Sequence, residues 1–238
     1  MKSLLAIISV MILASCAQKP SDRVDPADYE AFWLWAGVMP QPVLARAKTV
    51  YLLSGEIRRE SGTFVNLRPA TPRLGVQNLW LVVRVDTLRW KRGTTARLMS
   101  EVARWRAGGN NVRGVQIDFD ARTRHLDEYA RFLQAFRSDL SPSTRLSVTG
   151  LMDWGVNGDP IALGSLKGVV DEMVIQTYQG RQTVPNYEKY IGRLSRLSIP
   201  FKIGLVQGGE WRADPSLKRT PHFRGYVVFL VISSHKPS

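Results

Sequence analysis

The chain has 238 residues, and 33 Lys and Arg outnumber 20 Asp and Glu, for a formal net charge of +13. Its single cysteine excludes an intramolecular disulfide and any metal site built from several thiolates. The positive charge is mostly arginine spread along the chain, without a basic run or an aromatic RNA-binding motif. We therefore expect no nucleic-acid partner. Lipid phosphates or anionic glycans are alternative counter-ions, beside a generally basic surface with no specific ligand.

Residues 1–16 predict an export signal. Lys2 precedes an apolar run over residues 4–13, which is too short to span a bilayer and is typical of a signal-peptide core. Residues 13–16, Leu-Ala-Ser-Cys, resemble the lipobox of bacterial lipoproteins. This resemblance implies a signal peptide over residues 1–15 and acylation of Cys16. An ordinary signal peptide cut elsewhere is the alternative.

Residues 16–30 are predicted to form a lipidated tether, because they are mostly polar and include Pro20 and Pro26. Ala17 follows Cys16 at a position where Asp is the usual inner-membrane retention signal of Gram-negative lipoproteins. The resemblance therefore implies an outer-membrane anchor facing the periplasm. We expect residues 31–238 to form a single domain with one large core.

Eight apolar runs after the tether predict short strands. They cover residues 32–37, 50–53, 79–85, 112–118, 146–151, 173–178, 201–206 and 226–232. Helical spacing of apolar residues lies between several runs, over residues 98–105, 126–136 and 187–197. The alternation of strand and helix predicts a parallel α/β sheet, and eight strands predict a (β/α)8 TIM-like barrel.

Some helices of this barrel are expected to be reduced. The gaps after the first two runs are short or Pro-rich, which predicts turns in place of helices, and few residues follow the last run, so the last helix is expected to be missing. An open doubly wound sheet is the structural alternative. No Gly-rich phosphate loop follows the first run, which argues against a nucleotide-binding version of that sheet.

The run 114–120 alternates apolar and polar residues and ends in two carboxylates. Successive side chains on a strand point to opposite faces, so Gln116, Asp118 and Asp120 are expected to share one face. The Cα atoms of the two aspartates would lie roughly 6 to 7 Å apart, near enough for one charge to raise the pKa of the other. Such a pair can retain one proton, as general acid catalysis requires. The alternative is a strand-end pair that caps the next helix.

The ends of later strands carry more polar and aromatic residues, which a barrel would gather on its C-terminal rim. They are Asp153, Trp154, Gln176, Tyr178, Gln179, Gln207, Glu210 and Trp211. Acids and amides bind sugar hydroxyls and aromatic rings stack on pyranose faces, so the convergence predicts a sugar site, although any single Trp is more often a core residue. Arg84 and Arg181 are expected to hold anions or to pair with carboxylates such as Asp118. The three histidines lack metal-ligand spacing, so no metal or other cofactor is expected.

Several segments resemble a bacterial family of unknown function, DUF3142. They are residues 32–35, 116–120, 149–154, 176–181, 204–211 and 223–229. This resemblance implies no assigned activity. The fourth and sixth predicted strands more distantly resemble those of family 18 glycoside hydrolases, the chitinase-like barrels.

The family 18 resemblance implies catalytic roles by position. Asp120 stands where the general acid protonates the glycosidic oxygen, and Asp118 where an acid orients the substrate's acetamide. Tyr178 stands where a Tyr bonds the acetamide oxygen, while Gln116 and Gln179 replace acids. Asp120 is one methylene shorter than the family's Glu, and a displacement of about 1 Å can lower a rate about a hundredfold. The last predicted strand also lacks the Trp on which the sugar rests.

The resemblance thus implies a lipid-anchored envelope protein that acts as a glycoside hydrolase on an amino-sugar-containing glycan. Its catalytic residues would be Asp120, Asp118 and Tyr178, and Gln116 would join the other rim residues in binding substrate. The alternative is a non-catalytic carbohydrate-binding lipoprotein with a degenerate cleft. A scaffolding lipoprotein is a third hypothesis, whose sign would be a large exposed apolar patch. In each case the membrane is reached through Cys16.

Overall fold

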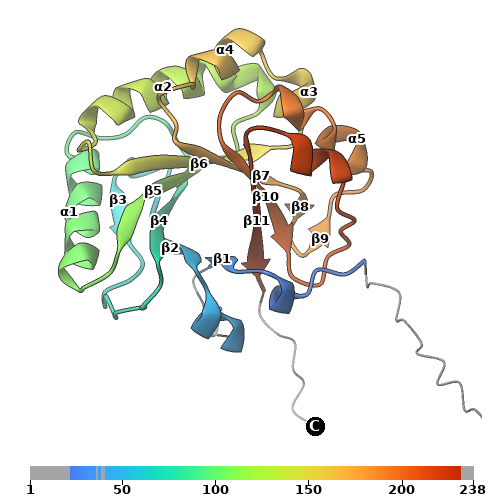
Figure 1. Ribbon diagram of the computed structural model, residues 1–238. Helices are drawn as coiled ribbons and strands as arrows, with labels where there is room; N and C mark the ends of the chain where they lie inside the picture. Colours follow the sequence, from blue (N-terminus) through green and yellow to red (C-terminus); the bar gives the residue numbers. More distant parts are fainter. Residues whose placement is uncertain (1–21, 36, 39–40, 232–238) are drawn as a thin grey trace, which may run out of the picture.

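The computed structural model describes residues 22–35, 37–38 and 41–231. These residues form a closed barrel of eight parallel strands (Figure 1), which confirms the predicted fold class. Each strand overlaps one of the eight apolar runs, with bounds that differ by a few residues. The strands are β1 (Ala31–Leu34), β2 (Thr49–Ile57), β4 (Asn78–Val85), β5 (Val112–Asp118), β6 (Arg145–Leu151), β7 (Glu172–Gln176), β10 (Phe201–Val206) and β11 (Phe223–Leu230).

The barrel closes through a pairing of its first two strands. The strand order is β1-β11-β10-β7-β6-β5-β4-β2, and β1 also pairs with β2 in parallel. The short β3 (Phe64–Asn66) pairs with β2 in antiparallel fashion, and β8 (Tyr178–Gln179) and β9 (Gln182–Thr183) form a hairpin after β7. The parallel register of β4 and β5 places Arg84 directly beside Asp118.

A glycine permits the close approach of β5 to β6. A Cβ atom at Gly114 would lie 2.0 Å from the carbonyl oxygen of Arg145 on the neighbouring strand. Any larger residue would therefore separate the two strands or shift their register. Because β5 carries both Gln116 and Asp118, the position of these side chains depends on this contact.

Two long helices cover one part of the barrel, to the left and top in Figure 1. They are α1 (Thr94–Ala107) and α2 (Leu126–Asp139), and each buries the apolar stripe predicted from the sequence. The other connections carry shorter elements, with η denoting a 3-10 helix. They are η1 (Pro26–Asp28), η2 (Pro42–Arg46), η3 (Thr123–His125), α3 (Trp154–Asn157), α4 (Pro160–Ser165), α5 (Glu188–Ile191), η4 (Leu194–Arg196) and η5 (Pro215–Arg219).

The connections agree in part with expectation. Only η2 follows β1, and the antiparallel β3 follows β2, so the helices after the first two strands are reduced as predicted. The stripe over residues 187–197 predicts one helix, but the chain forms α5 and then η4, with Gly192 between them. Glycine disfavours a continuous helix because of its backbone freedom. The predicted absence of the last helix concerns residues 232–238, which lie outside the described residues.

Apolar residues pack in two layers, one outside and one inside the strands. The outer layer joins strands to helices and contains Val115 and Ile117 of β5 together with Leu133 of α2. The inner layer is smaller, and its buried members are Trp33, Tyr51, Leu53, Trp80, Val82, Val174 and Val227. Since alternate residues of a strand face inward, the polar side chains of β5 lie on the inner side. The barrel interior is thus partly polar near β5.

Residues 22–30, which belong to the expected tether, lie against the barrel. Val24 is buried, and its amide donates to the carbonyl of Gly209 at 2.8 Å. Cys16 and the signal sequence lie outside the described residues. Among the helices that the structure describes, none combines the length and apolar character needed to cross a bilayer.

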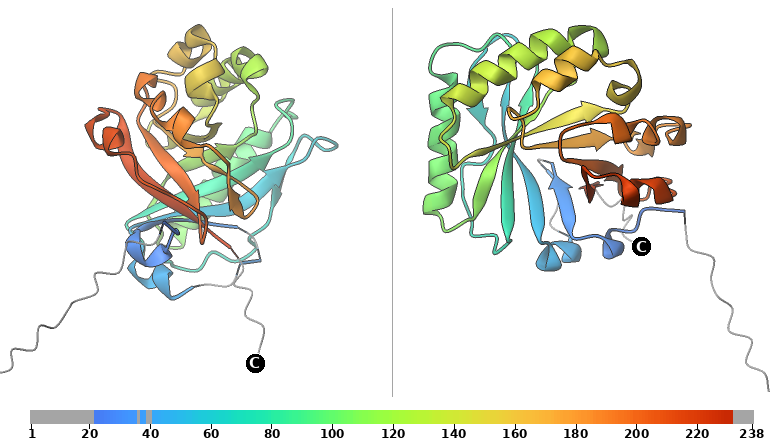
Figure 2. Two further views of the ribbon diagram at one scale, coloured as in Figure 1. Left: turned by 90° about the vertical axis from the view of Figure 1, so that its right-hand side faces the viewer. Right: turned by 45° about the horizontal axis from the view of Figure 1, so that its top comes forward.

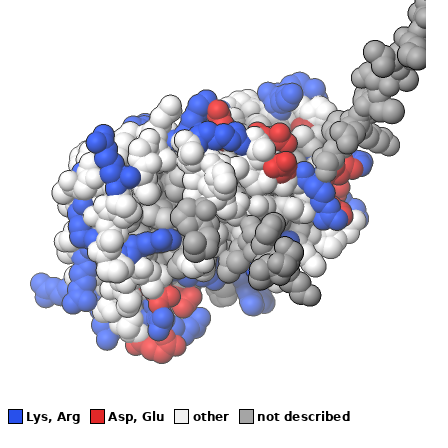
Figure 3. All heavy atoms as spheres, turned by 90° about the horizontal axis from the view of Figure 1, so that it is seen from below, with Lys and Arg blue, Asp and Glu red and all other residues white. Residues whose placement is uncertain are grey.

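The helices cover the barrel unevenly, and the charges on its surface are mixed. Figure 2 shows α1, α2 and α4 packed around one part of the barrel, whereas the β1–β2 part carries only short turns in the described residues. On the face drawn in Figure 3, acidic and basic side chains are interspersed and form no field of one sign. This agrees with the scattered arginines of the sequence.

Candidate functional site

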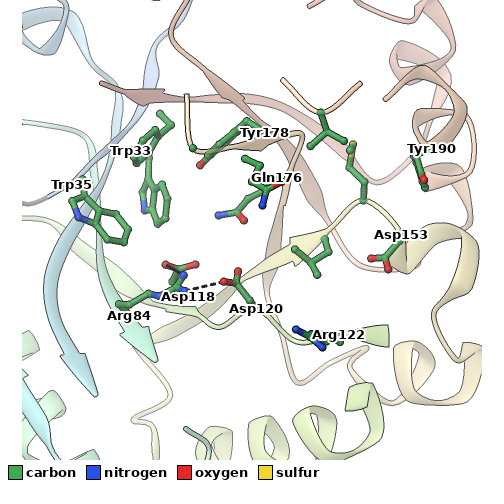
Figure 4. Close-up of a pocket in the computed structure, with 16 residues that line it drawn as sticks. Trp33, Trp35, Arg84, Asp118, Asp120, Arg122, Asp153, Gln176, Tyr178 and Tyr190 are labelled. Atoms are coloured by element: carbon green, nitrogen blue, oxygen red, sulfur yellow. Dashed lines mark hydrogen bonds and ion pairs between the residues drawn. The ribbon is translucent and has the colours of Figure 1, made fainter. Parts of the chain in front are cut away.

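A cleft of about 540 Å³ lies at the C-terminal ends of the strands (Figure 4). It contains the predicted residues Asp118, Asp120, Asp153, Gln176, Tyr178 and Gln179. The other residues that line it are Trp33, Trp35, Arg84, Arg122, Leu151, Met152, Gly180, Val184, Tyr190 and Phe229. Residues from both ends of the chain therefore meet at the rim where barrel topology predicts a site.

Two carboxylates and one guanidinium form the charged part of the cleft. Asp118, at the end of β5, is fully buried, whereas the side chain of Asp120 is 54% exposed. Arg84 bridges them, with Nη1 donating to Asp118 Oδ2 at 3.1 Å and Nη2 donating to Asp120 Oδ2 at 2.8 Å. Thr149 of β6 donates to the remaining oxygen of Asp118 at 2.9 Å. One arginine thus partly neutralises two acids, and the more exposed acid borders the open cleft.

Burial controls the protonation of Asp118. It raises the pKa of this carboxyl above the ordinary value, while Arg84 and Thr149 oppose the rise and the nearby charge of Asp120 adds to it. We predict a raised pKa for at least one of the two aspartates, and the direction for Asp118 agrees. The main cause is burial, however, and Asp120 contributes least. For Arg84, burial alone would lower the pKa, but the two carboxylates outweigh it and raise the pKa.

Aromatic rings form the apolar wall of the cleft. Tyr178 stacks on Phe229 of β11 with ring centroids 5.4 Å apart, and Trp33 lies 5.1 Å from the same Phe229 ring. Trp35 packs edge-on against Trp33 at 5.5 Å. Burial raises the pKa of the Tyr178 phenol well above its ordinary value, so this hydroxyl stays protonated and can donate a hydrogen bond.

Two polar groups that line the cleft lack partners among the described residues. The indole Nε1 of Trp33 is buried and donates to no protein atom, although Trp33 is only 6% exposed. Asp153 Oδ1 is likewise buried without a hydrogen bond, and burial raises the pKa of this carboxyl. Buried polar groups without partners are rare in proteins and usually indicate a bound water, an ion or a functional role.

Gln116 lies beneath the cleft. It is 1% exposed, and its amide nitrogen donates to Ser147 Oγ at 3.0 Å on the neighbouring strand. It borders a small void of about 10 Å³ that also touches Gln176 and Tyr178. Gln116 therefore supports the floor of the site and does not line the cleft.

Four predicted rim residues lie away from the cleft. Trp154 is buried in the core, where its indole donates to the carbonyl of Ala121 at 3.0 Å, and Trp211 is 7% exposed and stacks on Tyr187 at 4.8 Å. Both have the apolar ring that a core position and a sugar platform equally require, which is why the sequence does not separate the two.

The remaining two are polar residues in structural contacts. Gln207 exchanges side-chain hydrogen bonds with Gln41 at 3.0 and 3.1 Å and accepts from the amide of Val231. Glu210 is exposed and lies 3.5 Å from Arg23. These contacts join the segment after β10 to Arg23, Gln41 and Val231, and neither residue lines the cleft.

Sequence reasoning missed several cleft residues, chiefly Trp33, Trp35, Tyr190 and Phe229. Trp33 and Trp35 alternate at the end of β1, and this period of two is the signal that places both on the inner face. Arg84 is expected to hold an anion or to pair with a carboxylate, and it pairs with Asp118. No cluster of three or more potential metal ligands occurs among the residues that the structure describes.

Comparison with known proteins matches part of the chain to a family model and shows which solved structures share its fold. Residues 77–186 match the family model described as a domain of unknown function, DUF3142, which confirms the predicted resemblance over this region. No curated protein sequence matches the chain.

Solved structures with the same fold include the chitinase domain of spore coat protein CotE from Clostridium difficile. Its TM-score is 0.52 at 14% identity, over 83% of this chain and 68% of that one. A xylanase–α-amylase inhibitor protein, solved with trehalose, gives 0.54 at 10% identity, over 84% and 92%. The spore cortex-lytic enzyme SleL of Bacillus cereus gives 0.49 at 18% identity over 74% of this chain, which spans 49% of that enzyme. The first two matches show that the chain has the fold of the chitinase-like TIM barrels.

Proposed function

We propose that this protein is a glycoside-hydrolase-like lipoprotein of the cell envelope whose cleft takes an amino-sugar-containing glycan. The composition of the cleft carries this proposal, because acids, amides and aromatic rings from strands far apart in sequence converge on one rim. Sugar sites combine stacking faces with a few convergent hydrogen-bonding groups. The chitinase-like fold supports the same class of ligand.

The hydrolytic form of this proposal assigns a role to each polar group. Asp120, which faces the open cleft, protonates the leaving glycosidic oxygen as the substrate's acetamide oxygen, oriented by Asp118, attacks the anomeric carbon. Water then attacks that carbon, and its proton returns to Asp120. The phenolic O–H of Tyr178 donates a hydrogen bond to the acetamide oxygen. The hydroxyl is suited to this role because a phenol donates a hydrogen bond and Tyr178 lines the cleft.

A second candidate is glycan binding without hydrolysis, and the position of Arg84 favours it. Arg84 donates to Asp120 Oδ2 at 2.8 Å, so one oxygen of this carboxylate is already held by the protein. A general acid must direct its carboxyl oxygen at the glycosidic oxygen. Hydrolysis therefore asks more of Asp120 than binding does, because binding is compatible with the ion pair as it stands.

One substitution separates the two candidates. If Asp120 is the general acid, Asp120→Asn should lower turnover by about two to four orders of magnitude and leave glycan affinity within a few-fold. Wild type and variant are compared on peptidoglycan, chitin-type and poly-N-acetylglucosamine substrates, with product release and retention measured together. Retention without turnover by both proteins supports binding alone. Equal, non-zero product from both removes Asp120 from the mechanism, and no retention by either contradicts the proposal.

The envelope anchor is proposed from residues 13–16 and has its own test. Cys16→Ala should leave the precursor unprocessed and without a lipid, because the acylated thiol is gone. Metabolic labelling with a fatty acid should mark the wild type and not the variant. Wild-type protein that takes up no fatty acid would contradict an anchor at Cys16, and with it the predicted outer-membrane location.

A further inference from the structure

A second hollow of about 840 Å³ adjoins the cleft. It lies between the turn after β2, the loop after β4 and the segment from the end of β5 to the first turn of α2. Arg84, Asp120 and Arg122 line both hollows. The Arg84–Asp120 ion pair thus lies at the boundary between the two hollows, in the lower part of Figure 4. The two hollows together are called the groove.

The two parts of the groove differ in chemistry. The cleft has five aromatic residues in its wall, whereas Phe119 is the single Phe, Tyr or Trp among the described residues that line the second hollow. Instead of rings, this hollow is lined by charged side chains of both signs, among them Arg59, Glu60, Arg89, Arg122 and Glu128. A pyranose ring has no stacking platform there comparable to that of the cleft.

Several of these charges are available to a ligand. Arg59, Glu60, Arg89 and Glu128 are exposed, and their side chains form no ion pair or hydrogen bond within the described part of the chain. Arg122 at the boundary between the hollows is also exposed and unpaired within those residues. The hollow therefore presents free cations and free anions within one concave surface, a pattern complementary to a ligand that carries both charges.

We infer that the glycan of the proposed function carries a short peptide, and that the charged hollow binds the peptide while the aromatic cleft binds the sugar. The free arginines meet the carboxylates of the peptide, and Glu60 and Glu128 meet its ammonium groups. This inference rests on the proposed function, since it extends the same groove. A neutral homopolymer would use only the aromatic part.

The experiment compares one disaccharide with and without its peptide. The probes are soluble disaccharide–peptide fragments of peptidoglycan and the same disaccharide after enzymatic removal of the peptide, with affinity measured by titration calorimetry. Exposed charge pairs are individually weak, so we expect Arg59→Gln/Arg89→Gln to bind the peptide-bearing fragment about tenfold more weakly. Its affinity for the bare disaccharide should stay within about twofold of wild type, because the cleft is intact.

The matched control is Arg97→Gln, which removes an exposed arginine of α1 that lines neither hollow. It should bind both fragments as wild type does. Raising the salt concentration should weaken only the peptide-bearing fragment, since screening acts on exposed charges. Thermal unfolding checks that all variants remain folded.

The outcomes separate this inference from the proposed function. Equal wild-type affinity for the two fragments, or an equal loss for both in the double variant, overturns the peptide assignment and leaves the glycan proposal standing. Binding of the peptide-bearing fragment that Trp35→Ala does not weaken would instead contradict the sugar role of the cleft. Binding of neither fragment contradicts both.

Discussion

The barrel contains two charged networks, one near each end of its strands, and they are built differently. Near the N-terminal ends, Lys202 of β10 lies 2.9 Å from Glu172 of β7 and donates to the Tyr51 hydroxyl at 2.8 Å. Tyr51 in turn donates to Glu172 and stacks on Trp80. At the C-terminal ends, Arg84 pairs with both Asp118 and Asp120 beside an open cleft.

The difference indicates which network is structural. The network at the N-terminal ends joins a single cation, Lys202, to a single acid, Glu172, and the rings of Tyr51 and Trp80 pack beside it. In the network at the C-terminal ends, Arg84 alone faces Asp118, Asp120 and, at 3.9 Å, Asp86. The unpartnered Trp33 Nε1 and Asp153 Oδ1 line the same cleft. A satisfied network stabilises the fold, whereas unsatisfied groups beside an open volume are expected where a ligand completes the hydrogen bonds.

Removing the cation from each network should give the largest effect. Arg84→Met leaves the fully buried Asp118 without its counter-charge, and breaking a buried pair in this way costs about 3–5 kcal/mol of unfolding free energy. Lys202→Met should cost less, about 1–3 kcal/mol, because Tyr51 still donates to Glu172. Urea unfolding of the two variants measures the difference.

A double variant tests the cause of the first effect. Arg84→Met combined with Asp118→Asn removes the buried charge together with its partner, so most of the lost unfolding free energy should return. A double variant as unstable as Arg84→Met would show that Arg84 stabilises this end of the barrel by packing and not by its charge. A larger loss for Lys202→Met than for Arg84→Met would reverse the comparison of the two networks.

The next largest effect should be a pH dependence of stability that comes from Asp118 in the network at the C-terminal ends. Asp118 has a folded-state pKa above its ordinary value of 3.8, so folding favours its protonated form. Its contribution to stability is complete below the ordinary pKa and is lost as the pH rises through the raised folded-state pKa. Asp118→Asn should therefore lose less stability than wild type over this acidic range, as measured by urea unfolding at several pH values. Parallel curves would show that Asp118 titrates as a solvated carboxyl.

The parts of this molecule that the sequence predicts are those where one physical requirement dominates. The eight strands are apolar runs because they are buried on both sides, and the alternation in residues 114–118 places Gln116 and Asp118 inside the barrel. The stripes of α1 and α2 have the same origin. The predicted positions of side chains are wrong where two environments, the core and a sugar site, favour the same residue type. Trp154 and Trp211 follow strand ends, as a sugar platform would, yet they fill the core.

The partners in the cleft depend on strand neighbours that are distant in sequence. Arg84 meets Asp118 because β4 and β5 pair in that register. Trp33 meets Phe229 because the closing barrel places β1 against β11. Neither contact follows from local pattern, since it requires the strand order and the register together. The chemistry of the cleft is therefore less predictable from sequence than the barrel that forms it.

The smallest effect should come from the aromatic wall of the cleft. Trp35 is half-buried at the cleft edge and packs against Trp33, so its ring offers a face to a sugar. Trp35→Ala should weaken retention on an insoluble amino-sugar glycan about fivefold, since an aromatic contact is worth about 1 kcal/mol. Trp35→Phe keeps a stacking face and should retain most of the affinity. Because Trp35 lies outside both charged networks, the unfolding free energy should change far less than in Arg84→Met.

Equal retention by wild type and Trp35→Ala would remove this ring from the sugar site, while equal losses in the Ala and Phe variants would indicate a role for the indole nitrogen.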